Sequence, residues 1–198
     1  MGQLVIALVG PQLAGKGKLV GAIEDWCGRE RVIRHCTGDI IRQMARDRGL
    51  EPTRPNCDQL VRDLSSEHGE CFLADAIRTN LLAASTPVVI FDSMRQLVDE
   101  QMVIRLPLQH LRVYVTAPPE VRYQRALARQ RTGEHQLSWK EFQSHEKLPM
   151  ERLISLIGDR ANDVLDNGGS DNENDTMRQE FCQRRLRKYA RQCAVDMA

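Results

Sequence analysis

The sequence predicts an α/β protein, a three-layer α/β/α sandwich in which helices cover both faces of a five-stranded parallel sheet. Two observations lead to this prediction. Five β-rich apolar runs occur along the chain, and helix-forming sequence follows them. Runs that are apolar almost throughout indicate strands buried on both faces, which is typical of parallel sheets. The runs lie at residues 4–9, 31–36, 87–92, 111–117 and 163–167.

Start signals support the helices between these strands. Asp39 stands at the head of "DIIRQMARDRG", Pro119 lies in the first turn of "PEVRYQRALARQR", and Ser138 precedes "WKEFQSHEK". Side-chain oxygens cap helix N-termini, and proline is tolerated in the first turn because no hydrogen bond is lost there. We therefore expect helices to begin at these three places.

Turn-forming residues predict the longer connections. Residues 49–58 hold two prolines and a glycine and are expected to form a loop, and residues 130–138 are polar and are expected to form a loop or lid. The acidic, turn-rich stretch 167–176 is expected to lead into a basic C-terminal helix at about 174–194.

Size, composition and charge bound the class of protein. The 198 residues, 41% hydrophobic and 28% charged, indicate one globular domain with a small insertion. A net charge of +1 indicates no overall attraction to nucleic acid or membranes, so any anion site must be local. No apolar run approaches the roughly 20 residues that span a bilayer. The six cysteines form no CxxC pair, so we expect reduced thiols in a cytoplasmic protein.

The first strand leads into "GPQLAGK", which has the pattern of a phosphate-binding loop. Backbone amides of such a turn can surround a phosphate, the helix N-terminus adds partial positive charge, and the lysine supplies a mobile cation. The alternative is a glycine-rich turn that binds nothing. The residues predicted to bind the donor are Gly10, Pro11, Ala14, Gly15, Lys16, Gly17 and Lys18.

Four later segments extend this motif to a family. "CTGDIIRQ" (36–43), "VVIFDSMR" (88–95) and "APPEVRYQRALAR" (117–129) are similar, in the same order, to segments of the nucleoside monophosphate kinases. "DVLDNGGS" (163–170) is similar to the final strand and adenine-side turn of dephospho-coenzyme A kinases. The chain thus resembles the P-loop nucleoside monophosphate kinase superfamily over most of residues 3–170. "GDIIRQMARDRGLEPT" also resembles a group of archaeal kinase-like proteins.

The resemblance implies a sheet of order 2-3-1-4-5 and ATP and Mg²⁺ as cofactors. It also implies an acceptor-binding helical insertion at about residues 38–82 and a lid at about 129–147, within one domain. A small-molecule nucleotide acceptor is the expected partner, and no particular oligomeric state is predicted.

Individual residues take roles from the same resemblance. Lys16 and Arg95 would be catalytic, and Asn167 would lie beside the adenine. Thr37, Arg42 and Arg95 would contact the acceptor, since a planar guanidinium can grip a phosphate through two parallel bonds. Asp92 would act on magnesium through water, because a hard cation prefers oxygen ligands.

Asp39 remains open to three interpretations. It can cap a helix, contact the acceptor or, if the acceptor is an alcohol, accept its proton. Thr37 could equally be an ordinary strand-end hydroxyl, and Arg42 one of many arginines on a solvated helix face.

Arginines recur on the helix that leads to the predicted lid. Arg122, Arg125 and Arg129 fall at i, i+3 and i+7, and Arg131 follows. Such a face can neutralise charge on a transferring phosphoryl group, so Arg125 and Arg129 are predicted to be catalytic. The alternative is a solvated basic face paired with nearby carboxylates.

Three positions depart from the family pattern. Lys18 stands where a magnesium-side threonine is usual, and His145 stands where relatives often carry an arginine. Asp99 occupies the place of a glutamine that reads the acceptor base in adenylate kinases, so AMP is not the automatic acceptor.

The sequence therefore predicts phosphoryl transfer from ATP to a nucleoside or deoxynucleoside monophosphate. One alternative is a dephospho-coenzyme A kinase-like transfer to a ribose hydroxyl. Another is a regulator or adaptor that binds nucleotide with little turnover. The basic segment 178–193 leaves RNA binding open, although packing by its apolar stripe is the plainer interpretation.

Overall fold

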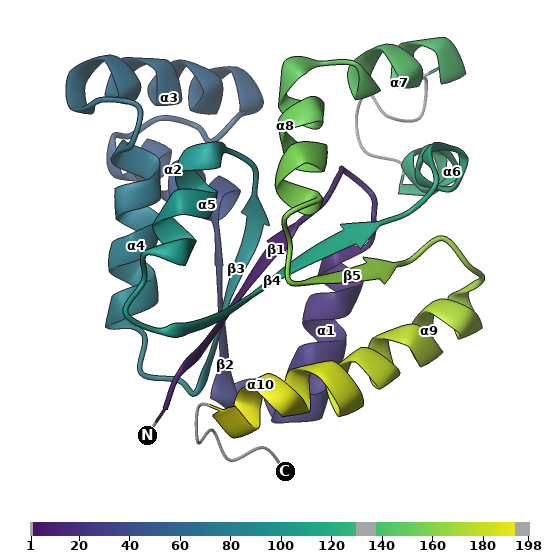
Figure 1. Cartoon of the computed structure of the whole chain (residues 1–198). Helices are drawn as coiled ribbons and strands as arrows, with labels where there is room; N and C mark the ends of the chain where they lie inside the picture. Colours follow the sequence, from purple (N-terminus) through teal and green to yellow (C-terminus); the bar gives the residue numbers. More distant parts are fainter. Residues whose placement is uncertain (1, 130–137, 193–198) are drawn as a thin grey trace.

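The computed structural model describes residues 2–129 and 138–192. Five strands form one sheet in the order β2-β3-β1-β4-β5, and every neighbouring pair is parallel, as predicted. Figure 1 shows the sheet between its two layers of helices. The strands are β1 (Leu4–Val9), β2 (Val32–Cys36), β3 (Val88–Met94), β4 (Gln109–Thr116) and β5 (Asp163–Asp166).

Helices connect the strands and extend the chain at its C-terminal end. They are α1 (Lys16–Cys27), α2 (Thr37–Asp47), α3 (Arg54–His68), α4 (Phe72–Ala83), α5 (Leu97–Ile104), α6 (Pro119–Arg129), α7 (Trp139–Glu146), α8 (Pro149–Gly158), α9 (Asp171–Glu180) and α10 (Arg187–Gln192), with the short 3₁₀ helix η1 (Arg29–Arg31) and the π-helical segment η2 (Phe181–Leu186). No helix within the two described ranges is long and apolar enough to cross a membrane.

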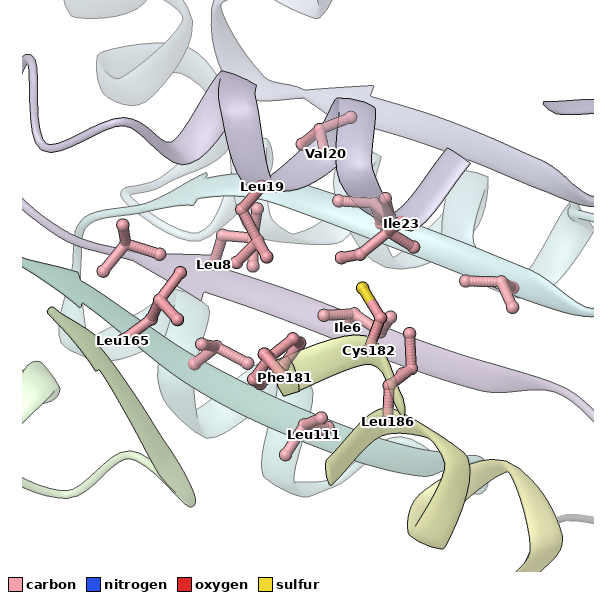
Figure 2. Packing of buried hydrophobic residues seen from close by; sticks show 14 of the residues in the cluster. Ile6, Leu8, Leu19, Val20, Ile23, Leu111, Leu165, Phe181, Cys182 and Leu186 are labelled. Carbon is pink, nitrogen blue, oxygen red and sulfur yellow. The ribbon is translucent and has the colours of Figure 1, made fainter. Parts of the chain in front are cut away.

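Strand β1 divides the core between the two faces of the sheet. Its even-numbered side chains pack with α1 and η2, as Figure 2 shows for Ile6 and Leu8 against Ile23 and Phe181. Its odd-numbered side chains pack with α4, α5 and α8. All six residues of the strand are fully buried, which explains why its sequence is apolar throughout.

The two edge strands are less buried than the sequence predicted. In β2, Ile33 and Arg34 are exposed, and in β5 Val164 is exposed. A strand at the edge of a sheet has a neighbour on one side only, so its residues are covered less completely. This difference leaves Arg34 close to solvent, which matters for the site described below.

Two predicted helix starts are confirmed. Helix α6 begins at Pro119. Helix α7 follows Ser138, which accepts a hydrogen bond from the Glu141 amide while Glu141 bonds back to the Ser138 amide. This reciprocal arrangement satisfies two amides that the helix itself leaves unpaired.

Three predicted boundaries are wrong. Helix α2 begins at Thr37, so Asp39 lies inside its first turn and is not its cap. The predicted loop 49–58 ends early, because Thr53 caps α3 and a proline fits the first turn of that helix. The basic helix begins at α9 rather than at about residue 174, because Ser170 forms a capping box ahead of it.

Candidate functional site

A cleft of about 1190 Å³ opens at the carboxyl ends of the strands. Its walls come from the turn before α1, β2 with the start of α2, the end of β3, helix α6 and the segment after β5. Ligands of open parallel sheets bind at this edge. Cavities for one small molecule are usually about 300–1000 Å³, so the cleft is large enough for two.

The turn between β1 and α1 has the strained backbone of a phosphate-binding loop. Gly10, Leu13 and Gly15 have φ angles of 153°, 65° and 100°. A Cβ atom on Gly10 would lie 2.1 Å from the Val115 carbonyl oxygen, and one on Gly15 would lie 1.9 Å from the Asn167 side chain. Both glycines are therefore required by close approach as well as by backbone angle.

Lys16 begins α1 and folds back over this loop. Its Nζ donates hydrogen bonds to the carbonyls of Gly10, at 2.7 Å, and Pro11, at 2.9 Å. Pro11 has no amide hydrogen and contributes its carbonyl. Burial lowers the pKa of Lys16 to about 8, against the opposing effect of Asp92. The ammonium is thus held by two neutral carbonyls, which phosphate oxygens can replace.

Two predicted site residues, Asn167 and Arg125, donate hydrogen bonds to backbone carbonyls of the phosphate loop. Asn167 is buried, its Nδ2 donates to the Ala14 carbonyl at 2.9 Å, and its Oδ1 accepts from Arg178. Arg125 donates to the Leu13 carbonyl at 3.1 Å and to the Asn167 carbonyl at 2.7 Å. In this structure both side chains hold the backbone of the loop.

The two arginines predicted to bind the acceptor also line the cleft, and each lies beside a carboxylate. Arg42 pairs with Asp39 at 2.5 Å, both on α2. Arg95 Nη2 lies 3.5 Å from Oε1 of Glu151, a residue of α8. Thr37 is at the start of α2, and its Oγ1 is buried without a hydrogen-bond partner in the described structure. This part of the cleft therefore holds two arginines, each paired with a carboxylate.

Asp92 lies near the end of β3 and has a partner that sequence reasoning missed. Arg34 of β2 donates to the Asp92 Oδ2 from Nε at 3.0 Å and from Nη2 at 2.5 Å. The Ser93 hydroxyl donates to Oδ1 at 3.2 Å. The one available signal was an arginine in the middle of the predicted strand "RVIRHC".

The candidate metal-ligating side chains of the cleft fit magnesium only when a bound nucleotide supplies further ligands. No cluster of three or more candidate ligands occurs in the part of the chain that the structure describes. Gly17 and Lys18 supply no hydroxyl at the start of α1. Magnesium commonly keeps several waters and uses one or two carboxylates with substrate phosphates, so Asp92 fits in kind and place. Its Oδ2, however, is engaged by Arg34.

The predicted arginine face of α6 is divided. Arg122 is buried, pairs with Glu146 of α7 and donates to the Ala117 carbonyl, and it is not among the residues that line the cleft. Arg125 and Arg129 do line the cleft, as does Lys18. Arg131 and most of the predicted lid loop lie outside the described residues.

Asp99 and His145, two positions that depart from the family pattern, are not among the residues that line the cleft. The Asp99 carboxylate accepts hydrogen bonds from the amides of Arg95 and Gln96, both at 3.0 Å, and thus caps α5. Burial raises its pKa despite these bonds. His145 is exposed in the last turn of α7. The structure therefore gives Asp99 a structural role.

The C-terminal helices pack by an apolar stripe, as the plainer interpretation of the sequence predicted. Phe181 and Leu186 are buried in the cluster that contains Ile6 and Leu8 of β1 (Figure 2). Tyr189 packs against the same cluster. Arg178, predicted as part of a basic surface, is instead buried and reaches Asn167. Cys193 lies outside the described residues.

Solved structures of other proteins define the class to which this architecture belongs. A shikimate kinase from Bacteroides thetaiotaomicron matches 93% of this chain and 98% of its own, with a TM-score of 0.61 and 19% identity. A gluconokinase from Sinorhizobium meliloti 1021 matches 98% of this chain and 94% of its own, with a TM-score of 0.51 and 19% identity. With the strand order and the loop, these likenesses show that the chain has the P-loop kinase fold.

Similar sequences come from proteins named only as UPF0200 proteins. The one from Hyperthermus butylicus is 35% identical over 109 residues, which span 55% of this chain and 58% of that protein. The one from Thermococcus gammatolerans is 26% identical over 175 residues, which span 86% of this chain and 89% of that protein. No family model matches the chain.

Proposed function

We propose that this protein is a kinase that transfers the γ-phosphoryl group of ATP to a small anionic acceptor, with a nucleoside or deoxynucleoside monophosphate as the acceptor. One observation carries this proposal. A single cleft is lined both by the phosphate loop with Lys16 and by Arg42 and Arg95. The loop with Lys16 suits the donor phosphates, the two arginines suit an anionic acceptor, and the cleft volume of about 1190 Å³ accommodates both.

On the donor side, the loop supplies positioned donors with little rearrangement. Amides of the loop face the phosphates, and the Lys16 ammonium exchanges its two carbonyl partners for phosphate oxygens. Asp92 would hold the water shell of the donor's magnesium, which when bound neutralises charge on the β- and γ-phosphates. Arg125 and Asn167 keep the loop in shape during this exchange.

On the acceptor side, Arg42 and Arg95 would exchange their carboxylate partners for the acceptor phosphate. Charge-assisted, two-pronged contacts of this kind fix both position and orientation. An acceptor phosphate oxygen is already a competent nucleophile, so it attacks the γ-phosphorus in line and ADP leaves. Catalysis then rests on positioning and charge stabilisation, without a covalent intermediate.

A second candidate is transfer to an alcohol, as in dephospho-coenzyme A kinases. Two proteins with this fold are named as a shikimate kinase and a gluconokinase, and neither is named as a nucleotide kinase. For an alcohol, Asp39 would accept the hydroxyl proton. Asp39→Asn should then nearly abolish transfer, whereas transfer to a phosphate should survive in part.

The test is ADP release from MgATP by the purified protein, with nucleoside monophosphates, deoxynucleoside monophosphates and dephospho-coenzyme A as acceptors. We expect release that depends on one acceptor class and that is lost in Lys16→Ala. If ATP binds but no acceptor raises turnover above the Lys16→Ala background, the kinase proposal fails. The protein would then be a nucleotide-binding regulator, and Lys18 and His145 would be the positions to restore to the family pattern.

A further inference from the structure

The ion pair between Arg34 and Asp92 links strands β2 and β3 where both residues line the cleft. Arg34 lies on β2, two positions before Cys36, and Cys36 pairs in register with Asp92 of β3. The guanidinium therefore reaches along the sheet to the Asp92 carboxylate. Two of its nitrogens bind one oxygen, Oδ2, at 3.0 and 2.5 Å, and Ser93 engages the other. Both carboxylate oxygens are thus engaged.

The side chains of Arg34 and Asp92 differ in how much they are exposed to solvent. Only 5% of the Asp92 side chain is exposed, against 42% of Arg34. Asp92 lies on a strand buried on both faces, whereas Arg34 extends from an edge strand and already lines the cleft. Burial lowers the pKa of Arg34, but the Asp92 charge outweighs this effect and raises it. Because Arg34 is the more exposed partner, the arginine can turn while the carboxylate stays in place.

The other two acceptor-side arginines are arranged in the same way. Arg42 is paired with Asp39, and Arg95 lies beside Glu151. With Arg34 on Asp92, three cations facing the cleft are each balanced by a carboxylate in this structure. An entering anion gains most by drawing on such partly exposed guanidinium groups, since a guanidinium can change partners without losing its charge.

We propose that Arg34 is a positioning residue that couples acceptor binding to metal binding: an acceptor anion draws Arg34 away from Asp92, and Asp92 then becomes available to the donor's magnesium. This inference rests on the proposed kinase function. Without an acceptor, Arg34 competes for the carboxylate and weakens the hold on metal–nucleotide. By linkage, metal–nucleotide and acceptor anion then strengthen each other's binding by the same factor.

The test measures metal binding rather than turnover. Mn²⁺ binding in the presence of the non-hydrolysable donor AMPPNP is followed by electron paramagnetic resonance in the wild type and in Arg34→Met, which keeps an apolar stem but cannot donate. We expect Arg34→Met to bind Mn²⁺ at least about 5-fold more tightly than the wild type. Arg42→Met removes the same charge from the same cleft but leaves Asp92 paired, so its Mn²⁺ affinity should match the wild type.

Inorganic phosphate serves as the anion probe. It should tighten Mn²⁺ binding in the wild type and have little effect in Arg34→Met. Arg34→Lys gives a second, milder variant, with Mn²⁺ affinity between the other two because one ammonium replaces two hydrogen bonds. Thermal melting checks that each variant is folded.

The outcomes separate this inference from the kinase proposal. If AMPPNP binds normally but Arg34→Met leaves Mn²⁺ affinity unchanged or weaker, the coupling is refuted and the kinase proposal stands. A lack of phosphate effect in the wild type refutes it equally. If AMPPNP does not bind to the wild type at all, the kinase proposal fails and the coupling fails with it.

Discussion

Raising the pH from about 7 to about 9 should weaken donor binding about tenfold, which is about 1.4 kcal/mol. Burial lowers the pKa of Lys16 in the free protein to about 8. Donor phosphates favour the ammonium, so the pKa of the bound state is higher. The protonated fraction in the free protein falls from about nine-tenths to about one-tenth over this range. Affinity is therefore complete below the free-state pKa and is lost as the pH rises through it.

Isothermal titration of AMPPNP across this pH range, at constant ionic strength, measures the effect. Near pH 8, titration in two buffers with different ionisation enthalpies should also show uptake of about half a proton on binding. Lys16→Gln is the control, because its weaker affinity should not change over the same range. A wild-type affinity that stays constant between the two pH values would refute the assignment of Lys16 to the donor phosphates.

Three further predictions concern the support of the site. Asn167→Ala removes the hydrogen bonds to a loop carbonyl and to one nitrogen of the buried Arg178, so we expect a loss of about 2–4 kcal/mol in urea unfolding together with weaker AMPPNP binding. An unchanged AMPPNP affinity would contradict the bracing role. Glu100 of α5 is buried and pairs with Arg112 of β4 and with Arg160. Glu100→Ala leaves both arginines without this partner and should cost about 3 kcal/mol of stability without changing AMPPNP affinity, so a loss below about 1 kcal/mol would count against it. Gly10→Ala places a methyl group 2.1 Å from a carbonyl oxygen and should cost about 1–3 kcal/mol. Gly17→Ala, with no atom within 4 Å of the added carbon, is its matched control, and equal losses would refute the steric argument.

Features of the fold with local causes could be predicted from the sequence. The run at residues 4–9 is apolar because β1 is covered on both faces, and the glycines of "GPQLAGK" answer to the backbone angles at Gly10 and Gly15. The start of α2 was missed for an equally local reason. Its cap residue, Cys36, makes no side-chain capping bond, so no signal marks the boundary.

The site was less predictable where partners are distant in sequence. The spacing places Arg122 and Arg125 on one helix face, but their partners differ. Arg122 pairs with Glu146 of α7, whereas Arg125 donates a hydrogen bond to the Leu13 carbonyl of the phosphate loop. Arg34 and Asp92 are separated by 58 positions and meet because β2 and β3 are neighbours in the sheet. No spacing rule within one segment contains that information.

The bracing of the phosphate loop has a consequence for how this protein unfolds locally. The Ala14 carbonyl is held by Asn167, and Asn167 is held by Arg178 of α9, so the loop and the C-terminal helices share one chain of buried bonds. If the loop binds a donor nucleotide as proposed, opening of α9 and release of that nucleotide are linked equilibria. A bound donor analogue should slow hydrogen exchange of the backbone amides of α9, including those that lie well beyond the reach of any phosphate.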